Sequence, residues 1–275
     1  MSEGYLYVAN RPKLLSEAKI SARSLRRFTD RPIAIVLSEN INNDTLIDVF
    51  DQILVIPGIE KYSYLAKIIG ILNSPYEKTV FLDCDTFVCS DISELFNILE
   101  IADFATTQET SKHTGQLKSI RYKNILPEFN TGVMVFKKSD HVTKLFDDWL
   151  NVCVSQNIKF DMPGFREAVI ENFGELHYSI LPEEYNAHGF QSMIILYDDI
   201  KIIHGRLGNR WRTLTRYFLS FDKMQKFAEK INKKKMKRLY LPYLGVFPYT
   251  WNLNNLFYKI KKAFGVKRTS KYFSS

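Results

Sequence analysis

The sequence predicts an α/β fold with a mostly parallel sheet, because apolar runs of strand length alternate with helical stretches along most of the chain. Residues 5–9 form a strand-like run, and residues 14–28 carry helix formers at helical spacing. Residues 32–37 then form a short apolar run of the buried-strand type. Strand, helix and strand in this order start a parallel sheet.

The same alternation continues through the middle of the chain, over residues 46–50, 52–57 and the helical stretch 64–72. It then reaches a hydrophobic strand within residues 79–88. Beyond this strand, the residue patterns predict helices over 92–99 and 143–152 and strands over 131–136 and 201–204.

A long polar stretch over residues 106–128 interrupts the alternation. Binding loops of α/β proteins lie at strand ends, and the chain shows no internal repeat or low-complexity linker. The stretch is therefore predicted to be an active-site loop within one main domain.

The composition is that of a folded globular protein, with 275 residues of which 45% are hydrophobic and 14% aromatic. Cys84, Cys89 and Cys153 are too few for a disulfide framework and form no C-x-x-C pair. The opening residues show no basic segment followed by a long apolar run of the secretory type. These features predict a cytoplasmic protein.

The positive charge is unevenly distributed along the chain. The net charge is +8, but residues 1–229 hold 26 Lys and Arg against all 30 Asp and Glu, while residues 230–275 hold 12 Lys and Arg and no acid. The basic character belongs to the tail alone. No recognised nucleic-acid motif accompanies it, so no nucleic-acid partner is expected.

Two carboxylates end the central apolar strand. Asp83 and Asp85 flank one residue, and the period of two along an extended backbone points both to the same side. Ligands of open α/β sheets bind at the carboxyl ends of strands, and two like charges there require a cation such as Mg²⁺ or Mn²⁺. The alternative is a solvated strand end, because three-residue acidic patterns are common at turns.

Four sequence blocks extend this signal: residues 74–88 (SPYEKTVFLDCDTFV), 129–136 (FNTGVMVF), 181–186 (LPEEYN) and 202–205 (IIHG). In order and approximate spacing they resemble glycosyltransferase family 8, whose glycogenin-like and lipopolysaccharide galactosyltransferase-like members have a GT-A fold. The resemblance covers about residues 4–212. It implies a Rossmann-like nucleotide-diphospho-sugar transferase domain with a mixed, mostly parallel sheet and flanking helices.

The resemblance implies a metal site of three ligands, Asp83, Asp85 and His204. Taken alone, His204 would be a strand-end histidine capped by a neighbour. A nitrogen ligand beside two carboxylates favours Mn²⁺ over Mg²⁺, because imidazole suits the later transition ions better.

The resemblance also implies contacts to a UDP-sugar donor. The base and ribose would lie at the end of the first strand, and Gly205, Gly208 and a basic residue, either Arg206 or Arg210, would approach the diphosphate. Besides the metal ligands, the expected donor-binding residues are Val8, Ala9, Asn10, Lys67, Cys84, Asn130, Thr131, Gly132, Gly205, Gly208 and Arg210. For Lys67 and for residues 130–132, the alternatives are a solvated helix position and an ordinary turn.

Asp161, Asn130 and Asn186 are the catalytic candidates that the resemblance implies. In the family an aspartate and a glutamine adjoin near the sugar, but here Met162 follows Asp161, so a glutamine nucleophile is absent. The family retains anomeric configuration, and front-side attack needs no protein nucleophile. Asp161 would then orient hydroxyl groups electrostatically.

The tail combines basic and aromatic residues. Residues 239–258 carry no charge, while Pro242 and Pro248 oppose a membrane-spanning helix. Residues 252–264 place an apolar stripe beside lysines, which predicts an amphipathic helix at an acidic membrane surface. The alternative is that the aromatic side chains pack on the main domain and the lysines are solvated.

The sequence thus predicts a GT-A domain over residues 1–212 and a basic helical extension over 213–275. The predicted reaction transfers a sugar from a UDP-sugar to a hydroxyl of a glycan or lipid-linked acceptor, with a peripheral membrane location. A nucleotidyltransferase is one alternative, but residues 9–13 are not its glycine- and lysine-rich phosphate loop. A non-catalytic sugar-nucleotide-binding protein of the same fold is another.

Overall fold

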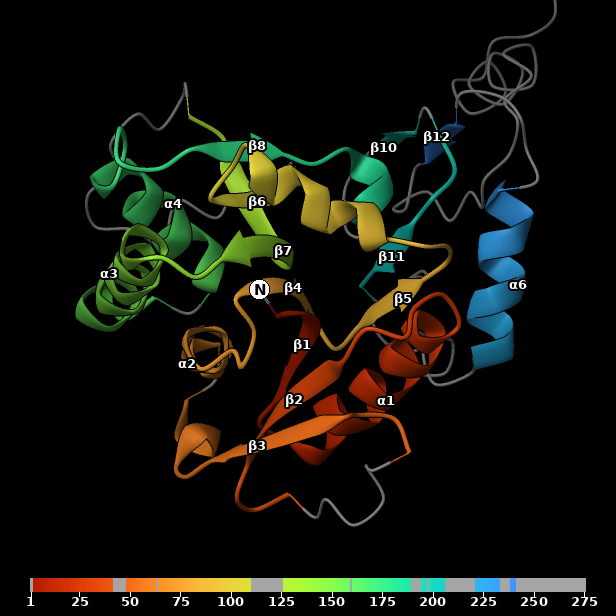
Figure 1. The fold of residues 1–275 in the computed structure, drawn as a ribbon, viewed down its shortest axis with the longest axis horizontal. Coiled ribbons are helices and arrows are strands. Elements are labelled where there is room, and N and C mark those ends of the chain that lie inside the picture. Colours follow the sequence, from red (N-terminus) through yellow and green to blue (C-terminus); the bar gives the residue numbers. More distant parts are fainter. Residues whose placement is uncertain are drawn as a thin grey trace, which may run out of the picture.

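The computed structural model describes residues 2–41, 48–62, 64–109, 126–158, 160–188, 194–196, 198–205, 221–232 and 238–240. Its centre is a seven-stranded sheet in the order β3-β2-β1-β4-β7-β6-β8 (Figure 1). Strand β7 pairs antiparallel with β4 and β6, and the other pairs of this sheet are parallel. The predicted mixed, mostly parallel sheet with flanking helices is confirmed.

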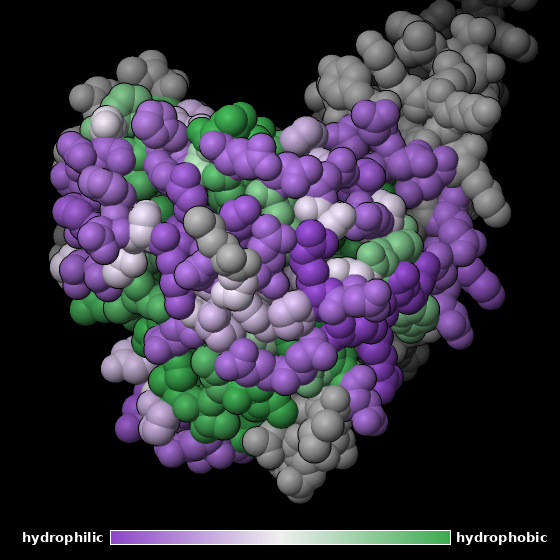
Figure 2. Space-filling view, in the orientation of Figure 1, coloured by the Kyte–Doolittle hydropathy of each residue, from purple (hydrophilic) through white to green (hydrophobic). Residues whose placement is uncertain are grey.

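The first half of the sheet is a run of parallel strands with a helical crossover. It comprises β1 (Glu3–Ala9), α1 (Pro12–Arg26), β2 (Ile33–Ser38) and β3 (Gln52–Ile56). Strands β1 and β2 are almost wholly buried, as expected for strands covered on both faces. Strand β3 lies at one edge of the sheet. In the region where Figure 1 places β3, Figure 2 shows apolar side chains on the surface.

Two hydrophobic cores cover the two faces of the sheet. One is built with α1 and the 3₁₀ helix η2 (Ser93–Glu100). The other is built with α2 (Leu65–Leu72), α3 (Asp140–Gln156) and α4 (Asp161–Glu171), and it includes the fully buried Trp149. A helix was predicted over the η2 segment, and the structure closes it with tighter 3₁₀ turns.

The predicted strand over residues 79–88 is in fact two strands, β4 (Lys78–Leu82) and β5 (Thr86–Val88). Residues between them form a turn, in which the Thr86 N–H donates to the Asp83 carbonyl at 3.1 Å. The expectation that an extended backbone aligns the two carboxylates was therefore wrong. Strand β5 leaves the main sheet and pairs with β11 (Ile202–His204), which also pairs with β9 (Ala187–His188).

The loop predicted over residues 106–128 was wrong at both ends, because residues 106–109 and residue 128 belong to paired strands. Strand β6 (Phe104–Glu109) pairs with β7 (Glu128–Lys137) and with β8 (Tyr178–Ile180). The residues between Glu109 and Leu126 lie outside the described part of the chain. Two short 3₁₀ helices, η1 (Ile59–Lys61) and η4 (Glu183–Tyr185), complete the connections described here.

Part of the basic extension packs on the main domain. Helix α6 (Phe221–Asn232) places Met224 in a small core with Phe87 of β5 and Ile203 of β11. Strand β12 (Arg238–Tyr240) pairs with β10 (Ile194–Leu196). The domain boundary near residue 212 and the helix predicted over 252–264 lie outside the described residues. Among the helices that the structure describes, none has the length and apolarity needed to cross a membrane.

Candidate active site

The chain brings the two carboxylates and the predicted histidine together at the end of β4. Antiparallel pairing of β5 with β11 sets His204 opposite Thr86, next to Asp85. The His204 Nε2 atom lies 3.5 Å from Asp83 Oδ2 and 3.4 Å from Asp85 Oδ1. One ligand atom from each of the three side chains lies within 4.8 Å of the others, so they form a potential metal site. We call Asp83, Asp85 and His204 the acid–histidine cluster.

The chemistry of this cluster fits a hard divalent cation. Both carboxyl side chains keep 23% of their surface exposed, which leaves an open side for a ligand, whereas the imidazole is buried. Burial alone would lower the pKa of His204, but hydrogen bonds and charges of the Asp83 and Asp85 carboxylates outweigh it and raise this pKa to about 9. In the metal-free molecule a proton therefore lies where a cation would bind. Two carboxylates and an imidazole suit Mn²⁺ or Mg²⁺.

Glycine 132 allows the histidine to approach. A Cβ atom at Gly132 would overlap the His204 ring, so any larger residue would push the imidazole away. The Gly132 carbonyl also accepts a hydrogen bond from the Asp83 N–H at 2.8 Å. Gly132 therefore contacts both the histidine and the acid turn, and its predicted contact with the donor stays a prediction.

A bulge in β7 presents Thr131 and Gly132 to the site. The register of β6 on β7 shifts between Thr106, which lies opposite Met134, and Thr107, which lies opposite Asn130. The Thr106 hydroxyl donates to the carbonyl oxygens of Asn130 and Val133, at both ends of the extra residues. Bulges redirect side chains and are frequent beside active sites. Sequence reasoning missed Thr106, because no local pattern marks a register shift between two strands.

A second charged group lies beside the cluster and is formed by Lys67 of α2 and Asp161, the first residue of α4. The Lys67 ammonium is 2.9 Å from Asp161 Oδ2 and 3.0 Å from Asp83 Oδ1. Thr131 donates its hydroxyl proton to Asp161 Oδ2 at 2.6 Å. Lys67 also donates to the carbonyl and hydroxyl oxygens of Thr131. We call Lys67 and Asp161 the lysine–aspartate pair.

Both members of the pair are charged. Burial would lower the pKa of Lys67, but the carboxylates of Asp161 and Asp83 more than reverse this and raise it. Burial would raise the pKa of Asp161, but the Lys67 charge and the Thr131 hydrogen bond lower it below its usual value. The lysine predicted as a donor contact is thus also the internal counterion of the predicted catalytic aspartate.

Of the two predicted asparagines, Asn186 bonds to His204 and Asn130 bonds to Asn186. Asn186 directly follows η4 in the sequence, and its Oδ1 lies 2.8 Å from His204 Nδ1. Its Nδ2 donates to Asn130 Oδ1 at 2.9 Å and to Thr107 Oγ1 at 2.7 Å. The structure therefore unites Asn130, Asn186 and His204 in one buried group.

The first strand ends at the same place. The Cys84 thiol donates to the Val8 carbonyl at 3.1 Å, and burial raises the pKa of this thiol well above its usual value. Asn10 Nδ2 donates to the Tyr62 carbonyl at 2.6 Å. A Cβ atom at Gly70 would overlap Val8, so this glycine lets α2 approach β1. Together with the buried Ala9, these contacts place the end of β1 beside the acid turn, and the base and ribose site expected there stays a prediction.

The sequence profile of glycosyl transferase family 8 matches residues 39–205, more than half of the chain. The chain belongs to glycosyl transferase family 8. It is therefore a sugar-transferring enzyme, and the resemblance deduced from the four sequence blocks is confirmed. No curated protein sequence matches the chain.

Solved structures show that this family 8 glycosyltransferase has the GT-A fold. Mouse xyloside xylosyltransferase 1 in its apo form is 15% identical, covering 74% of this chain and 98% of its own, with a TM-score of 0.51. Galactosyltransferase LgtC, in complex with donor and acceptor sugar analogs, is 11% identical over 82% of this chain and 95% of its own, with a TM-score of 0.55. Glycosyltransferase GlyE of Streptococcus pneumoniae TIGR4 is 14% identical over 86% of this chain and 64% of its own, with a TM-score of 0.55.

Two predicted donor residues of the enzyme cannot be placed. Gly208 and Arg210, as well as the alternative Arg206, lie outside the described residues. Gly205 is described, and it has a φ of 82°, in the left-handed region that favours glycine. Its N–H donates to the Asp85 carbonyl at 2.9 Å, which ties the end of β11 to the acid turn.

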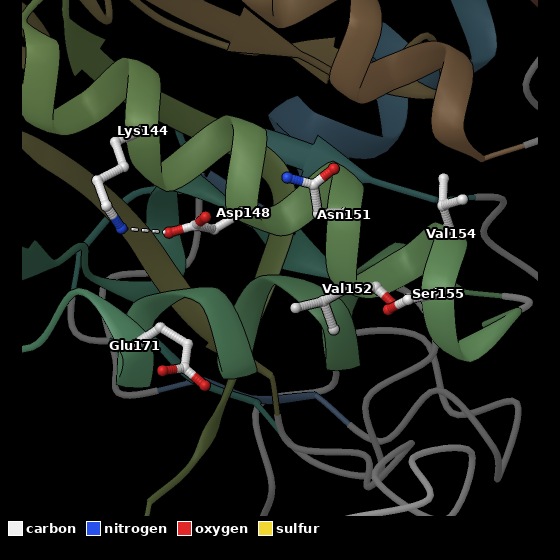
Figure 3. A pocket seen from close by; sticks show the side chains of 7 residues that line it. All are labelled: Lys144, Asp148, Asn151, Val152, Val154, Ser155 and Glu171. Carbon is white, nitrogen blue, oxygen red and sulfur yellow. Dashed lines mark hydrogen bonds and ion pairs between the residues drawn. The ribbon is translucent and has the colours of Figure 1, made fainter.

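A separate depression of about 500 Å³ lies between α3 and α4 of this glycosyltransferase (Figure 3). It is lined by Lys144, Asp148, Asn151, Val152, Val154, Ser155 and Glu171. The Lys144 ammonium is 2.6 Å from Asp148 Oδ2, so these two charged residues of the depression pair with each other. None of these residues belongs to the acid–histidine cluster or the lysine–aspartate pair, and the depression plays no part in the site.

Proposed function

We propose that this family 8 enzyme transfers a sugar from a UDP-sugar to a hydroxyl group of a glycan or lipid-linked acceptor, with Mn²⁺ or Mg²⁺ bound by Asp83, Asp85 and His204. The observation that carries the proposal is the convergence of these three side chains at one strand end. When bound there, the cation would neutralise charge on the departing diphosphate. The uridine base is what the family resemblance implies, and the end of β1 is its proposed site.

Asp161 is proposed to orient a hydroxyl group rather than to attack the sugar. Its carboxylate is only 5% exposed, and Lys67 and Thr131 both bond to one of its oxygens. Its place in the first turn of α4 stabilises the negative charge further, which makes the carboxylate a weak nucleophile. Met162, the next residue, carries no nucleophilic group.

Without a protein nucleophile, the proposed reaction retains anomeric configuration by front-side attack. The acceptor oxygen bonds to the anomeric carbon on the face from which the diphosphate leaves. The proton of the acceptor hydroxyl passes to the departing phosphate oxygen, so no further base is required. The enzyme's contribution is then to hold the acceptor hydroxyl on the face from which the diphosphate leaves and to stabilise charge.

The first test is UDP release by the purified chain with a panel of UDP-sugars, with and without Mn²⁺, beside an Asp83→Asn, Asp85→Asn double variant. Metal-dependent release with one sugar, absent in the double variant, is the expected result. The anomeric configuration of the product, read from proton coupling constants, tests retention. The proposal fails if the chain shows neither release nor metal-dependent UDP binding by calorimetry.

We also propose that residues 230–275 hold the enzyme at the cytoplasmic surface of a membrane. The support is their charge, 12 basic residues and no acid, beside an uncharged aromatic stretch. Sedimentation with vesicles tests this. The chain should bind vesicles containing phosphatidylserine and dissociate from them in high salt. A chain ending at residue 240, which loses six of the 12 basic residues and most of the aromatic stretch, should bind them more weakly. Equal binding to neutral vesicles would contradict the proposal.

A further inference from the structure

A buried row of hydrogen bonds runs from β6 to the acid–histidine cluster. Glu109 Oε2 accepts from Asn130 Nδ2 at 2.7 Å, and Asn130 Oδ1 accepts from Asn186 Nδ2 at 2.9 Å. Asn186 Oδ1 then meets His204 Nδ1 at 2.8 Å. The four residues are between 0% and 5% exposed, so water does not compete for these bonds.

The direction of every bond in the row is fixed by one backbone group. The Gly132 N–H can only donate, and it donates to Asn130 Oδ1 at 3.0 Å. Asn130 must therefore turn its Nδ2 toward Glu109, and the shared Oδ1 can only accept from the Nδ2 of Asn186. Asn186 then presents its Oδ1 to the imidazole, so His204 Nδ1 must carry a proton.

This fixed direction decides which nitrogen of His204 faces the carboxylates. With Nδ1 protonated and bonded to Asn186, the lone pair that a cation needs can only be on Nε2. Nε2 is the atom that lies within 3.5 Å of both Asp83 and Asp85. Hydrogen bonds to the second nitrogen of a metal-binding histidine set its tautomer and ring orientation.

We infer that Glu109 is a positioning residue for the metal ligand His204, acting through Asn130 and Asn186. The inference rests on the proposed metal-dependent function. It also gives Asn130 a positioning role beside its predicted donor-binding and catalytic roles, because both acceptor positions of its Oδ1 are occupied by Gly132 and Asn186. Thr107 supports the row from the side by accepting from Asn186 at 2.7 Å.

The experiment compares Glu109→Leu, Glu109→Gln and Asn186→Leu with the unaltered chain. Calorimetry measures the Mn²⁺ dissociation constant with UDP present, and the melting temperature is recorded for each variant. Glu167→Gln is the matched control, because Glu167 is also a buried carboxyl group but pairs with Arg166 at 2.6 Å, outside the row.

Glu109→Leu and Asn186→Leu should each weaken Mn²⁺ binding by on the order of 10- to 100-fold, the usual effect of losing such an outer partner. Glu109→Gln should bind Mn²⁺ nearly as well as the unaltered chain, because its amide oxygen still accepts from Asn130. Glu167→Gln should lower the melting temperature and leave Mn²⁺ binding unchanged. Mn²⁺ binding by Glu109→Leu that equals that of the unaltered chain would overturn the inference.

A second measurement uses the unaltered chain and needs neither a metal ion nor a variant. Nitrogen-15 NMR of the metal-free chain, at an alkaline pH where the imidazole is neutral, should show the remaining proton on His204 Nδ1 in slow exchange, since Asn186 accepts it in a buried place. A bare Nδ1 would overturn the inference even if Mn²⁺ binds. If the chain binds no Mn²⁺ but Nδ1 carries the proton, the bond direction stands and the metal-dependent function fails.

Discussion

The acid–histidine cluster and the lysine–aspartate pair are neighbours with opposite ways of balancing negative charge. Asp161 is buried, begins a helix and has Lys67 2.9 Å away, so its cation is part of the chain. Asp83 also pairs with Lys67 at 3.0 Å, but the side chains of Asp83 and Asp85 are 23% exposed and a proton on His204 lies between them. A covalently held ammonium cannot be exchanged, whereas a proton can be displaced by a cation from solution. The kind of counter-charge, rather than the aspartate itself, therefore distinguishes the fixed ion pair from the proposed metal site.

The largest expected effect is on catalysis, and it tests the exchangeable side of the comparison. Asp85→Asn removes one negative ligand, and UDP release should fall by at least about 10²- to 10³-fold, the scale of losing a main electrostatic stabiliser. The metal-free variant should melt at a lower temperature, because the Asp85 charge supports protonated His204, but it should stay folded because the Asp85 side chain is partly solvated. Turnover assays with Mn²⁺ and thermal unfolding measure the two quantities. Unfolding of this variant at room temperature would contradict the comparison.

The next effect is on stability, and it tests the lysine–aspartate pair, whose cation is part of the chain. Lys67→Met leaves Asp161 buried without its cation, which should cost about 3–5 kcal/mol in the free energy of unfolding. Adding Asp161→Asn should recover part of this loss, because the uncompensated charge is then removed. Urea unfolding of the two single variants and the double variant measures the coupling. Strict additivity of the two changes would show that the pair does not interact.

A moderate effect should follow from Gly132→Ala, which adds a methyl group where the His204 ring lies. Displacing the imidazole should weaken Mn²⁺ binding by roughly 10- to 100-fold, as for other losses of ligand orientation. Ser74→Ala, which alters a buried hydroxyl pair away from the site, is the control and should leave Mn²⁺ binding unchanged. Calorimetry with UDP and Mn²⁺ measures both variants.

The last prediction concerns the pH dependence of stability. The pKa of His204 is raised from 6.5 to about 9, so its protonation stabilises the metal-free chain fully below pH 6.5, and this stability is lost as the pH rises through 9. The pKa of Asp161 is lowered, so its contribution is present above its unfolded pKa near 3.8 and is lost as the pH falls through the folded value.

Thermal unfolding from pH 5 to pH 10 measures this difference. The melting temperature of the metal-free chain should fall on the alkaline side, and added Mn²⁺ should restore it, because the cation replaces the proton. His204→Gln should flatten the alkaline fall. An alkaline fall that persists unchanged in this variant would show that other groups cause it.

Local patterns of the sequence determined most of the elements around the site. Apolar runs and helical spacing located β1, α1, β2 and α3, because burial on one or two faces imposes these periods wherever the chain lies. The four blocks also identified the family and contain the acid–histidine cluster, whereas Lys67 and Asp161 lie outside them and were predicted from the family resemblance. The sequence by itself thus determined the fold class, the sugar-transfer chemistry and the identity of the acid–histidine cluster.

Only the tertiary structure decided how these residues meet. The acids lie on a turn rather than an extended strand, Lys67 bridges Asp83 and Asp161, and Glu109 reaches His204 through two asparagines. Glu109 was predicted to be in a loop, and helix α4, which begins with Asp161, was not predicted at all. These arrangements depend on strand register and on packing between segments far apart in the chain. A local pattern fixes the period of one segment, but only the folded neighbours fix which atoms face each other.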